Sequence, residues 1–451
     1  MTDQAVAGLN PPEVRSPKFV QALGFVAFRR KAMRSWIKRH GHVFEIKAPI
    51  FGRSVVVSDP ALVRSVCTAS VDQLVNVQPN LGNLFGPGST FALDGDRHRD
   101  RRRLLAPVFH GQNLKDLEKA VEEATLRECA NWPEGEEFRT LEPMCRITLD
   151  VILQFLFGAD DADGAEMGRL RQIIRAFNTL GSYMAFVPTP SFRTGRWSPW
   201  GVLNAYRRAY DRIVFTLIDR AEADPRLGER EDALALLLRS GRDDGTWMSR
   251  LEICDELLTL TVAGHETTSS ALSWAFERLR RHPDVLAELV REVDEGGSDF
   301  RRATILEVLR VRTIVDVVGR RVRVPNFSLG PWQIPRDRTV VVRIADLHEN
   351  PDIFPNPERF EPCRFLRTRP RAPEWLAFGG GVRRCLGADF AVFEVDVVLR
   401  TVLRNFWIQT DSAADEKPHF RGLGHTPWRG GRIVVRRRCR PGEGQSLCRP
   451  R

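Results

Sequence analysis

The stretch FGGGVRRCLG, from Phe378 to Gly387, places four glycines, two arginines and one cysteine within ten residues. A cysteine is a nucleophile or metal ligand as the thiolate, and nearby positive charge or a metal favours that ionised form. Glycines let backbone N–H groups approach a sulfur atom closely. A buried structural cysteine is the alternative interpretation, but it would require neither the arginines nor the glycines.

A second motif, AGHETT (Ala263 to Thr268), lies within the longest uninterrupted helical pattern, Leu251 to His282. A glycine in a helix interior costs about 1 kcal/mol relative to alanine, and threonine also has a lower helix propensity. Ala263 and Gly264 are expected to leave room for a flat cofactor against the helix backbone. The Thr267 hydroxyl can bond the carbonyl four residues back and open a local groove. An ordinary buried helix with a solvated glutamate is the alternative interpretation.

A third motif, EVLR (Glu307 to Arg310), is selected by its position, because its ExxR spacing is common in this chain. It lies between the long helical pattern and a β-rich stretch, and PERF (Pro357 to Phe360) follows it. Elsewhere the spacing is most simply explained by i,i+3 surface pairs worth a few tenths of a kcal/mol. These other pairs are Glu136/Arg139, Glu166/Arg169, Glu277/Arg280, Glu288/Arg291 and Glu361/Arg364.

The remaining chain predicts a helix-dominated protein with a small β-rich portion. The predicted elements are a basic amphipathic helix over 25–40, two strands within 42–60, mostly helices over 94–238, a small sheet region over 311–344 and a helix over 388–404. Residues 187–201 contain three prolines and two tryptophans. A connection of this length is either a lid over a site or a plain surface loop.

Five residues of the opening stretch, Phe378, Gly381, Arg383, Cys385 and Gly387, fit the pattern FxxGxRxCxG. At average residue usage, such a match arises by chance in roughly one of several thousand chains of this length. With the other two motifs, the pattern resembles the cytochrome P-450 superfamily of haem-thiolate monooxygenases over nearly the whole chain. The resemblance is greatest to soluble bacterial members of the actinobacterial or mycobacterial type. It implies the mainly α cytochrome P-450 fold with a small β-sheet portion.

The resemblance implies a role for each residue that matches a family motif. Cys385 is the axial ligand of haem iron, where a thiolate donates electron density that helps to split the O–O bond. Glu266 and Thr267 form the acid–alcohol pair that delivers protons to the distal oxygen. The residues implied to bind the haem are His98, Arg102, Ala263, Gly264, Arg320, Phe378, Arg383 and Gly387. The implied structural triad is Glu307, Arg310 and Arg359.

The charged stretch HRDRR supplies two of these haem contacts. His98 and Arg102 are four residues apart and therefore share one face of the predicted helix. A solvated basic face is the better interpretation for the arginines around them. Those arginines are Arg97, Arg99, Arg101 and Arg103.

By resemblance, the expected reaction inserts one oxygen atom from O₂ into an apolar organic substrate. Electrons would come from NAD(P)H through a separate ferredoxin or flavodoxin and its reductase, and the cofactor would be haem b. The alternatives are a peroxide-driven enzyme or an isomerase on the same fold, and a non-catalytic haem protein that binds a ligand. The acid–alcohol pair argues against a dedicated peroxygenase. The expected pocket segments are 76–91, 177–200, the long helix before Ala263, 311–318 and 422–428.

Two departures from the family pattern affect this expectation. VRTIVDVV, within residues 311–318, replaces the proline pair that is common after ExxR, so substrate analogy is weak at that border of the pocket. IPRDRTV, residues 334–340, lacks the usual glycine after Ile-Pro. The resemblance divides the chain into an extended segment over 1–18, one domain over 19–438 and a disordered basic tail over 439–451.

Composition limits the remaining possibilities. The 451 residues include 68 basic and 58 acidic side chains, a net charge of +10, which predicts a basic surface or a docking face for an acidic partner. No nucleic-acid-binding motif accompanies this charge. The eight cysteines form no CxxC pair, so a zinc site is not expected. Without a signal peptide or an apolar run of about 18 residues, we expect a cytoplasmic monomer with free thiols and no transmembrane segment.

Overall fold

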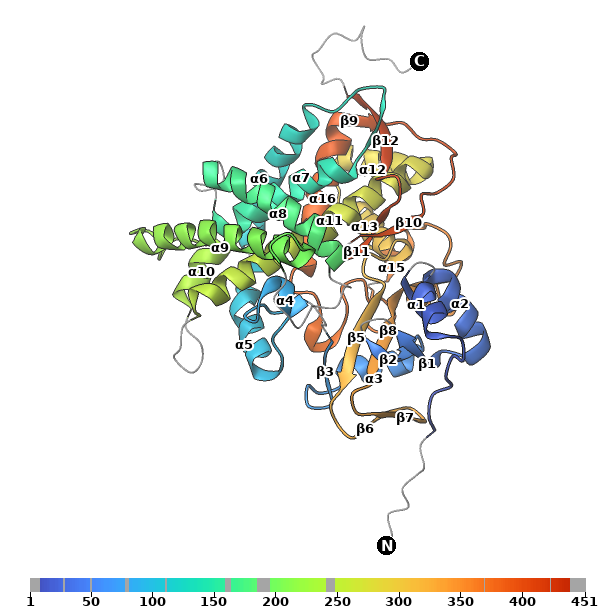
Figure 1. Ribbon diagram of the computed structural model, residues 1–451. Coiled ribbons are helices and arrows are strands. Elements are labelled where there is room, and N and C mark those ends of the chain that lie inside the picture. Colours follow the sequence, from blue (N-terminus) through green and yellow to red (C-terminus); the bar gives the residue numbers. More distant parts are fainter. Residues whose placement is uncertain are drawn as a thin grey trace.

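The chain forms a large helical part and a smaller β-rich part, as a computed structural model shows (Figure 1). The structure describes residues 9–26, 29–48, 51–77, 81–109, 112–158, 164–184, 195–240, 248–368, 370–421 and 423–438. The predicted tail at 439–451 lies outside these residues, as does most of the connection predicted over 187–201. No helix in the described ranges is both long and apolar enough to cross a membrane.

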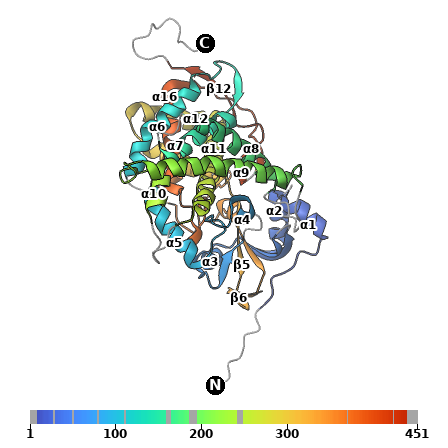
Figure 2. The same ribbon diagram turned by 60° about the vertical axis from the view of Figure 1, so that its left-hand side comes forward.

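The helical part is built around α11 (Arg250–Arg281). Its central neighbours are α7 (Leu141–Phe157) and α16 (Ala388–Asn405), and α6 (Gln112–Cys129) packs on both of these helices. Three helices cover one side, and α9 crosses the front of the molecule in Figure 2. These covering helices are α8 (Ala165–Met184), α9 (Pro199–Ala223) and α10 (Ala233–Arg239).

Both ends of α11 follow local sequence signals. Ser249 and Glu252 form a reciprocal capping box at the start, which satisfies backbone N–H groups that have no partner in the helix. Pro283 starts the next helix, because its fixed φ suits a first turn and its missing N–H is not needed there. The predicted helix over 251–282 is therefore confirmed almost to the residue.

The β-rich part contains a five-stranded sheet in the order β1-β2-β8-β5-β3. The β2–β8 pair is parallel and the other pairs are antiparallel. Its strands are β1 (Val43–Ala48), β2 (Gly52–Val57), β3 (Leu74–Asn76), β5 (Val317–Val322) and β8 (Thr339–Arg343). Smaller sheets pair β6 (Asn326–Leu329) with β7 (Trp332–Pro335), β10 (Pro418–Arg421) with β11 (Gly424–Pro427), and β12 (Arg432–Arg437) with both β4 (Glu137–Arg139) and β9 (Phe406–Ile408).

Short helices connect these parts. The helices before α6 are α3 (Pro60–Thr68), α4 (Leu81–Phe85), α5 (Gly95–Leu105) and the 3₁₀ turn Ala106–Phe109. Those after α11 are α12 (Pro283–Glu295), α13 (Asp299–Val311), α14 (Ile344–His348), α15 (Arg364–Arg367) and the 3₁₀ turn Gly381–Arg383. The last of these turns lies inside the cysteine stretch and precedes α16.

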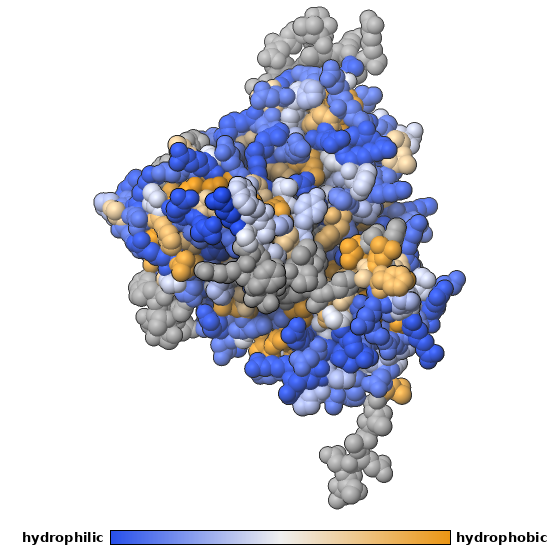
Figure 3. Space-filling view, in the orientation of Figure 1, coloured by the Kyte–Doolittle hydropathy of each residue, from blue (hydrophilic) through white to orange (hydrophobic). Residues whose placement is uncertain are grey.

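The prediction of one helix over 25–40 is wrong, because the structure has two helices there. They are α1 (Lys18–Val26) and α2 (Arg29–His40). Arg29 donates from Nε to the Phe25 carbonyl at 2.7 Å and from Nη1 to the buried Asp316 carboxylate at 2.6 Å. This side chain ties the ends of both helices to the β-rich part. Figure 3 shows an apolar patch at the position of α1 on an otherwise mostly hydrophilic face.

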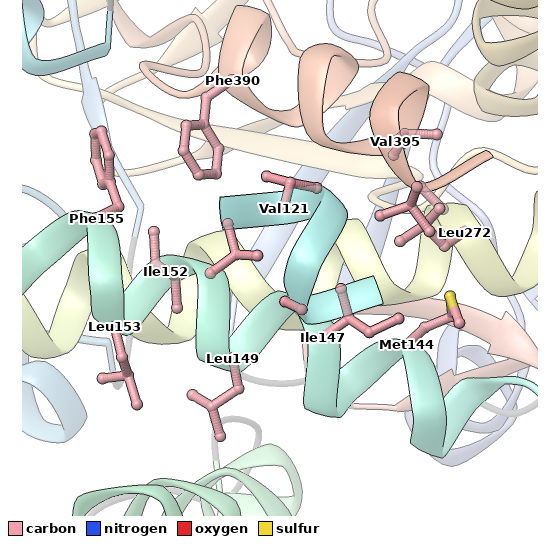
Figure 4. Close-up of a cluster of buried hydrophobic side chains, with 14 of the residues drawn as sticks. Val121, Met144, Ile147, Leu149, Ile152, Leu153, Phe155, Leu272, Phe390 and Val395 are labelled. Atoms are coloured by element: carbon pink, nitrogen blue, oxygen red, sulfur yellow. The ribbon is translucent and has the colours of Figure 1, made fainter. Parts of the chain in front are cut away.

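The largest core cluster lies where α6, α7, α11 and α16 meet (Figure 4). Phe155 of α7 and Phe390 of α16 point toward each other, with ring centroids 4.9 Å apart. Phe109 completes this aromatic group at 5.2 Å from Phe155 and 6.1 Å from Phe390. The start of α16, which follows the cysteine stretch directly, is thereby fixed to the helical core.

Candidate active site

The Cys385 loop is held by backbone contacts within the stretch itself. The Cys385 N–H donates to the Phe378 carbonyl at 2.8 Å, and the backbone N–H of Gly387 bonds the sulfur. The Phe378 ring lies edge-on to Trp375, with centroids 5.8 Å apart. These contacts fix the position of the thiol relative to the first turn of α16.

Gly381 in this loop cannot be replaced by another residue without distortion. Its φ is +66°, which L side chains rarely adopt. A Cβ atom at this position would lie 1.9 Å from the backbone oxygen of Cys67, at the end of α3. The glycine is therefore needed so that α3 and the cysteine loop can touch. Cys67 was not among the predicted site residues.

The protein atoms around the Cys385 thiol raise its pKa, because they displace the water that would stabilise the thiolate. The Gly387 N–H and the charges of Arg384 and Arg102 act in the opposite direction and lower the pKa. The loop alone therefore leaves the thiol neutral. A metal cation at the sulfur would stabilise the thiolate, so the donor chemistry fits a metal ligand.

Four predicted haem-binding residues lie close together beside this loop. His98 and Arg102 come from α5, Arg320 from β5 and Arg383 from the turn before Cys385. Pairing of β5 with β3 holds Arg320, since its partner in register is Asn76. Burial is the first cause that lowers the pKa of each of the four, and neighbouring arginines lower it further.

This cluster has more positive than negative charge. Burial, with the charges of Arg383, Arg102 and Arg320, lowers the pKa of His98 to about 3, so its imidazole is neutral. Asp94 is the acid beside the arginines, and its carboxylate accepts a hydrogen bond from Arg383. Half-buried charges of one sign normally require a counterion. The two carboxylates of a haem would supply it, so the cluster fits the predicted propionate contacts.

The middle of α11 has one accessible face. Between Ile253 and Arg280, all of which the structure describes, every residue is buried except five half-buried ones. Four of these recur at i, i+3, i+4 and i+7 and so share one side of the helix. The five are Leu260, Ala263, Gly264, Glu266 and Thr267. The structure therefore brings the predicted acid and alcohol to the same accessible stretch.

Glu266 has an unusual environment for a carboxyl group. Burial raises its pKa to about 7, while Arg421 and the hydrogen bond from Ser182 lower it. The Ser182 Oγ donates to its Oε1 at 3.4 Å. The carboxyl group therefore faces α8 and the β10–β11 hairpin. No hydrogen bond joins it to Thr267 in the described contacts.

The hydroxyl bond predicted for Thr267 is present, and neighbouring residues make it too. Its Oγ1 donates to the Ala263 carbonyl at 2.8 Å, and the Thr268 Oγ1 donates to Gly264 at 2.7 Å. The prediction that Gly264 leaves room for a cofactor stays a prediction, and the structure adds a second reason for this glycine. Its missing side chain makes room for Ile152 of α7, whose Cδ1 would lie 3.1 Å from a Cβ there. Glycine at this position serves close helix packing.

A pocket lies over Glu266 and draws on four of the five expected segments. No residue of 311–318 lines it. Most of its lining is apolar, and Asn178, Ser182 and Glu266 add polar groups. The Asn178 Nδ2 donates to the His265 Nε2 at 3.2 Å, and the Asn178 Oδ1 is buried without a partner among the described atoms. The apolar lining consists of Leu81, Leu84, Phe85, Phe177, Gly181, Val262 and Leu423.

The predicted structural triad contains one wrong residue. Glu307 and Arg310 form a fully buried pair on α13 with two 2.8 Å hydrogen bonds. The third member is Arg364, whose Nε donates to Glu307 at 3.1 Å. Arg359 is exposed and contributes its backbone carbonyl, which accepts from Arg310 at 2.9 Å. The sequence contained the signal, since PCRF (362–365) repeats the Pro-x-Arg-Phe spacing of PERF.

Arg101 also differs from its predicted solvated position, because it is 5% exposed. Its Nη1 donates at 2.7 Å both to the buried Glu256 of α11 and to the Gly88 carbonyl. Thr90 donates to the same carboxylate from its N–H and its hydroxyl. The segment before α5 is thus fixed to α11. No sequence spacing indicates this pair, because 155 residues separate its members.

Comparisons with known proteins identify the family. The Cytochrome P450 family model matches residues 11–429. The chain is 53% identical over 428 residues to "Putative cytochrome P450 138" of Mycobacterium tuberculosis, covering 95% of this chain and 96% of that protein. It is 35% identical over 435 residues to "Putative cytochrome P450 135B1" of the same species, covering 94% and 91%.

Solved structures show the same fold at lower identity. Retinoic acid-bound cyanobacterial CYP120A1 matches 96% of this chain and 100% of its own, with a TM-score of 0.83 and 22% identity. The haem domain of cytochrome P450DA matches 96% and 98%, with a TM-score of 0.78 and 22% identity. The predicted fold class is therefore confirmed. Together these matches show that the chain belongs to the cytochrome P450 family of haem-thiolate monooxygenases and is of the actinobacterial type.

Proposed function

We propose that this protein inserts one oxygen atom from O₂ into an apolar organic substrate. Its electrons would come from NAD(P)H through a separate ferredoxin- or flavodoxin-type carrier and its reductase. The observation that carries the proposal is the half-buried stretch of α11, where Thr267 lies on the accessible face and Glu266 lies next to it in an otherwise buried part of the helix. A haem b held by Cys385 supplies the redox chemistry of O₂ activation when it is bound.

The protein's own residues would hold that group and its charges. Cys385 would provide the sulfur ligand, and the Gly387 N–H, which bonds this sulfur, would limit the negative charge on it. Arg102, Arg320 and Arg383 provide cations for the propionates, and neutral His98 provides a hydrogen-bond donor.

Glu266 is suited to proton transfer near neutral pH. With a pKa of about 7, its carboxyl group is present in both protonation states and can release and regain a proton. Ser182 and Arg421 lie beside the carboxyl group and would orient it. The Thr267 hydroxyl points its hydrogen to the Ala263 carbonyl at 2.8 Å, which leaves its oxygen lone pairs free to accept a hydrogen bond.

The pocket composition supports an apolar substrate. Leucine, phenylalanine and valine side chains form most of its lining, so it favours an apolar body. Asn178 has a buried, unpartnered Oδ1 at the same place. A substrate with a hydrogen-bond donor could satisfy that oxygen.

A redox partner with an acidic face fits the charge of the chain. The net charge is +10, and Arg384 beside Cys385 is exposed. Exposed charges of this kind speed association more than they deepen affinity. Reversing the charge at Arg384 should slow reduction by such a carrier, and added salt should shrink the difference from the parent.

The proposal is tested by comparing Thr267→Ala with Thr268→Ala. Both hydroxyls bond the carbonyl four residues back, but Thr267 is on the accessible face and Thr268 is buried. The substrate is chosen from an apolar library by the change it induces in haem absorption. Thr267→Ala should keep haem and substrate binding and send several-fold more of the electrons to peroxide. Thr268→Ala should leave coupling unchanged.

Two results would contradict the proposal. Equal coupling in the parent and in Thr267→Ala would show that another group delivers the proton. Product formation with peroxide at the NAD(P)H-driven rate, and independent of any carrier, would favour the peroxide-driven alternative. Cys385→Ala serves as the reference for a protein without the axial sulfur, since it should lose the red-shifted band of the reduced, CO-bound form.

A further inference from the structure

Helix α1 buries an amide and a phenylalanine on its inner side and exposes further apolar residues on its outer side. Gln21 is fully buried, and its amide donates to the carbonyls of Val14 and Ser16 at 2.9 and 2.6 Å. Its oxygen accepts from the N–H of Lys47 at 2.7 Å. Phe25 is buried in the core cluster beside it, with its ring centroid 6.4 Å from that of Phe51. Gln21 and Phe25 therefore fix the inner side of the helix to the β-rich part, and the other large apolar residues of α1 face outward.

The outward face carries large hydrophobic side chains. Phe19 is 73% exposed, Leu23 is 55% exposed and Val26 is 54% exposed. Their spacing of i, i+4 and i+7 places them in one stripe along the helix. Val20 is 41% exposed beside this stripe. Figure 3 shows the resulting apolar patch at the position of α1, next to hydrophilic side chains at the position of α2.

Helix α2 adds a basic face to this apolar stripe. Residues 18–40 contain no aspartate or glutamate and seven basic residues, Lys18, Arg29, Arg30, Lys31, Arg34, Lys38 and Arg39. Arg29 is buried against Asp316, and Arg30 and Arg34 pair with Glu349. The other four are exposed and form no ion pair with any described residue.

The two helices lie beside the β10–β11 hairpin, which contributes one residue to the pocket lining. Figures 1 and 2 both place α1 and α2 at the periphery of the molecule. The Arg29 guanidinium lies 5.2 Å from the centroid of the Phe420 ring on β10. Leu423, at the turn of the same hairpin, lines the pocket over Glu266. A surface bound by α1 and α2 would therefore adjoin the hairpin that borders the site.

We infer that α1 and α2 form a docking surface for a membrane that contains anionic lipids. The apolar stripe would enter the boundary between headgroups and acyl chains, and the basic face of α2 would contact the negative headgroups. The role of this surface in supplying an apolar substrate rests on the proposed function. The binding itself does not depend on it.

A second copy of the chain fits this surface less well. A symmetric pair would bring the uncompensated charges of Lys18, Lys31, Lys38 and Arg39 against the same charges of the partner. The apolar stripe belongs to a single helix of nine residues, whereas stable interfaces bury roughly 800 Å² on each partner. An anionic bilayer matches both the charge and the narrow apolar stripe.

The test is flotation of the haem-loaded protein with vesicles of phosphatidylcholine alone or with added phosphatidylglycerol. Binding is expected to the anionic vesicles and to weaken as salt rises. Phe19→Ser with Leu23→Ser should weaken it at least about tenfold. Lys31→Glu with Lys38→Glu should remove the preference for anionic lipid. All side chains changed are exposed, and the CO spectrum of each variant reports its folding.

Matched controls distinguish binding through this surface from non-specific binding by exposed leucines and lysines elsewhere on the protein. Leu251→Ser changes a leucine that is 58% exposed at the start of α11, and Lys119→Glu reverses an 85% exposed lysine on α6. Both should bind vesicles as the parent does. The inference is wrong if the parent floats with neither vesicle or if the stripe variant floats equally well. It is also wrong if the parent is a dimer that the stripe variant converts to monomer. None of these results requires turnover, so they leave the proposed reaction untouched.

Discussion

Removing the Arg364 side chain should destabilise the protein far more than removing Arg359. The two arginines occupy equivalent places in successive Pro-x-Arg-Phe segments, PERF and PCRF. In the structure, Arg364 donates to the buried Glu307 carboxylate, whereas the exposed side chain of Arg359 makes no described hydrogen bond or ion pair. Arg359→Ala is therefore the matched control for Arg364→Ala.

The expected magnitude follows from the donors around Glu307. Its carboxylate accepts two bonds of 2.8 Å from Arg310, one of 2.9 Å from the Glu361 N–H and one of 3.1 Å from Arg364. Arg364→Ala removes one charged donor from a carboxylate with 0% exposure, which costs about 1.5–3 kcal/mol. Arg359→Ala keeps its backbone carbonyl and should change stability by less than about 0.5 kcal/mol.

Arg310→Ala supplies the upper limit of the series. It removes the principal charge partner of Glu307 and leaves three carbonyl oxygens, of His348, Pro357 and Arg359, without their donor. Loss of one member of a buried ion pair costs about 3–5 kcal/mol. The order of stability should therefore be the parent and Arg359→Ala, then Arg364→Ala, then Arg310→Ala.

The assay is urea unfolding of the haem-loaded proteins, monitored by far-UV circular dichroism. The midpoint urea concentrations are compared between variants whose unfolding free energy has the same dependence on urea concentration. The reasoning is refuted if Arg359→Ala shifts the midpoint as much as Arg364→Ala does. It is also refuted if Arg364→Ala leaves the midpoint unchanged. In that case Arg310 alone would compensate the buried carboxylate.

Three further predictions follow from other residues. Burial raises the pKa of Glu266 from its ordinary 4.5 to about 7, so its ionisation destabilises the fold as pH rises through that range. As the pH rises from 4.5 to 7, the free energy of unfolding of Glu266→Gln should increase by about 1–3 kcal/mol relative to that of the parent, as measured by urea unfolding. A difference between the two proteins that does not change with pH would contradict this. Gly381→Ala should cost more than about 2 kcal/mol and lower haem content, because its Cβ would meet a backbone oxygen at 1.9 Å with φ at +66°. Gly228→Ala is the control, because its added Cβ would meet no atom within 4 Å, and it should change neither stability nor haem content. Gly264→Ala should cost about 1 kcal/mol, and a double-mutant cycle should show that Ile152→Val relieves it.

Local rules account for the elements that the sequence predicted well. The long helix follows from the capping box at Ser249 and from Pro283 after its end, and both signals act within a few residues. The Thr267 hydroxyl bond spans one helical turn, so it too could be predicted. The single helix expected over 25–40 was wrong because Phe25 belongs to a separate helix, α1, and a local pattern does not show that α1 and α2 pack against each other.

The same distinction separates the correct site residues from the wrong ones. The sequence named Glu307 and Arg310 but offered Arg359 and Arg364 at equivalent spacings, and only packing places Arg364 at the carboxylate. Arg101 looked like its solvated neighbours on a charged helix. Its partner Glu256 is supplied by α11, more than 150 residues away.

The sequence by itself determined the family and predicted Cys385 as the haem ligand and Glu266 and Thr267 as an acid–alcohol pair, because each of these depends on residue types at short, fixed spacings. The tertiary structure decided which charges meet. It gathered arginines from α5, β5 and the cysteine loop into one half-buried cluster, and it left Phe19, Leu23 and Val26 of α1 exposed while burying Gln21 and Phe25. The physical reason is that burial and charge compensation depend on groups that only the folded chain brings within contact distance.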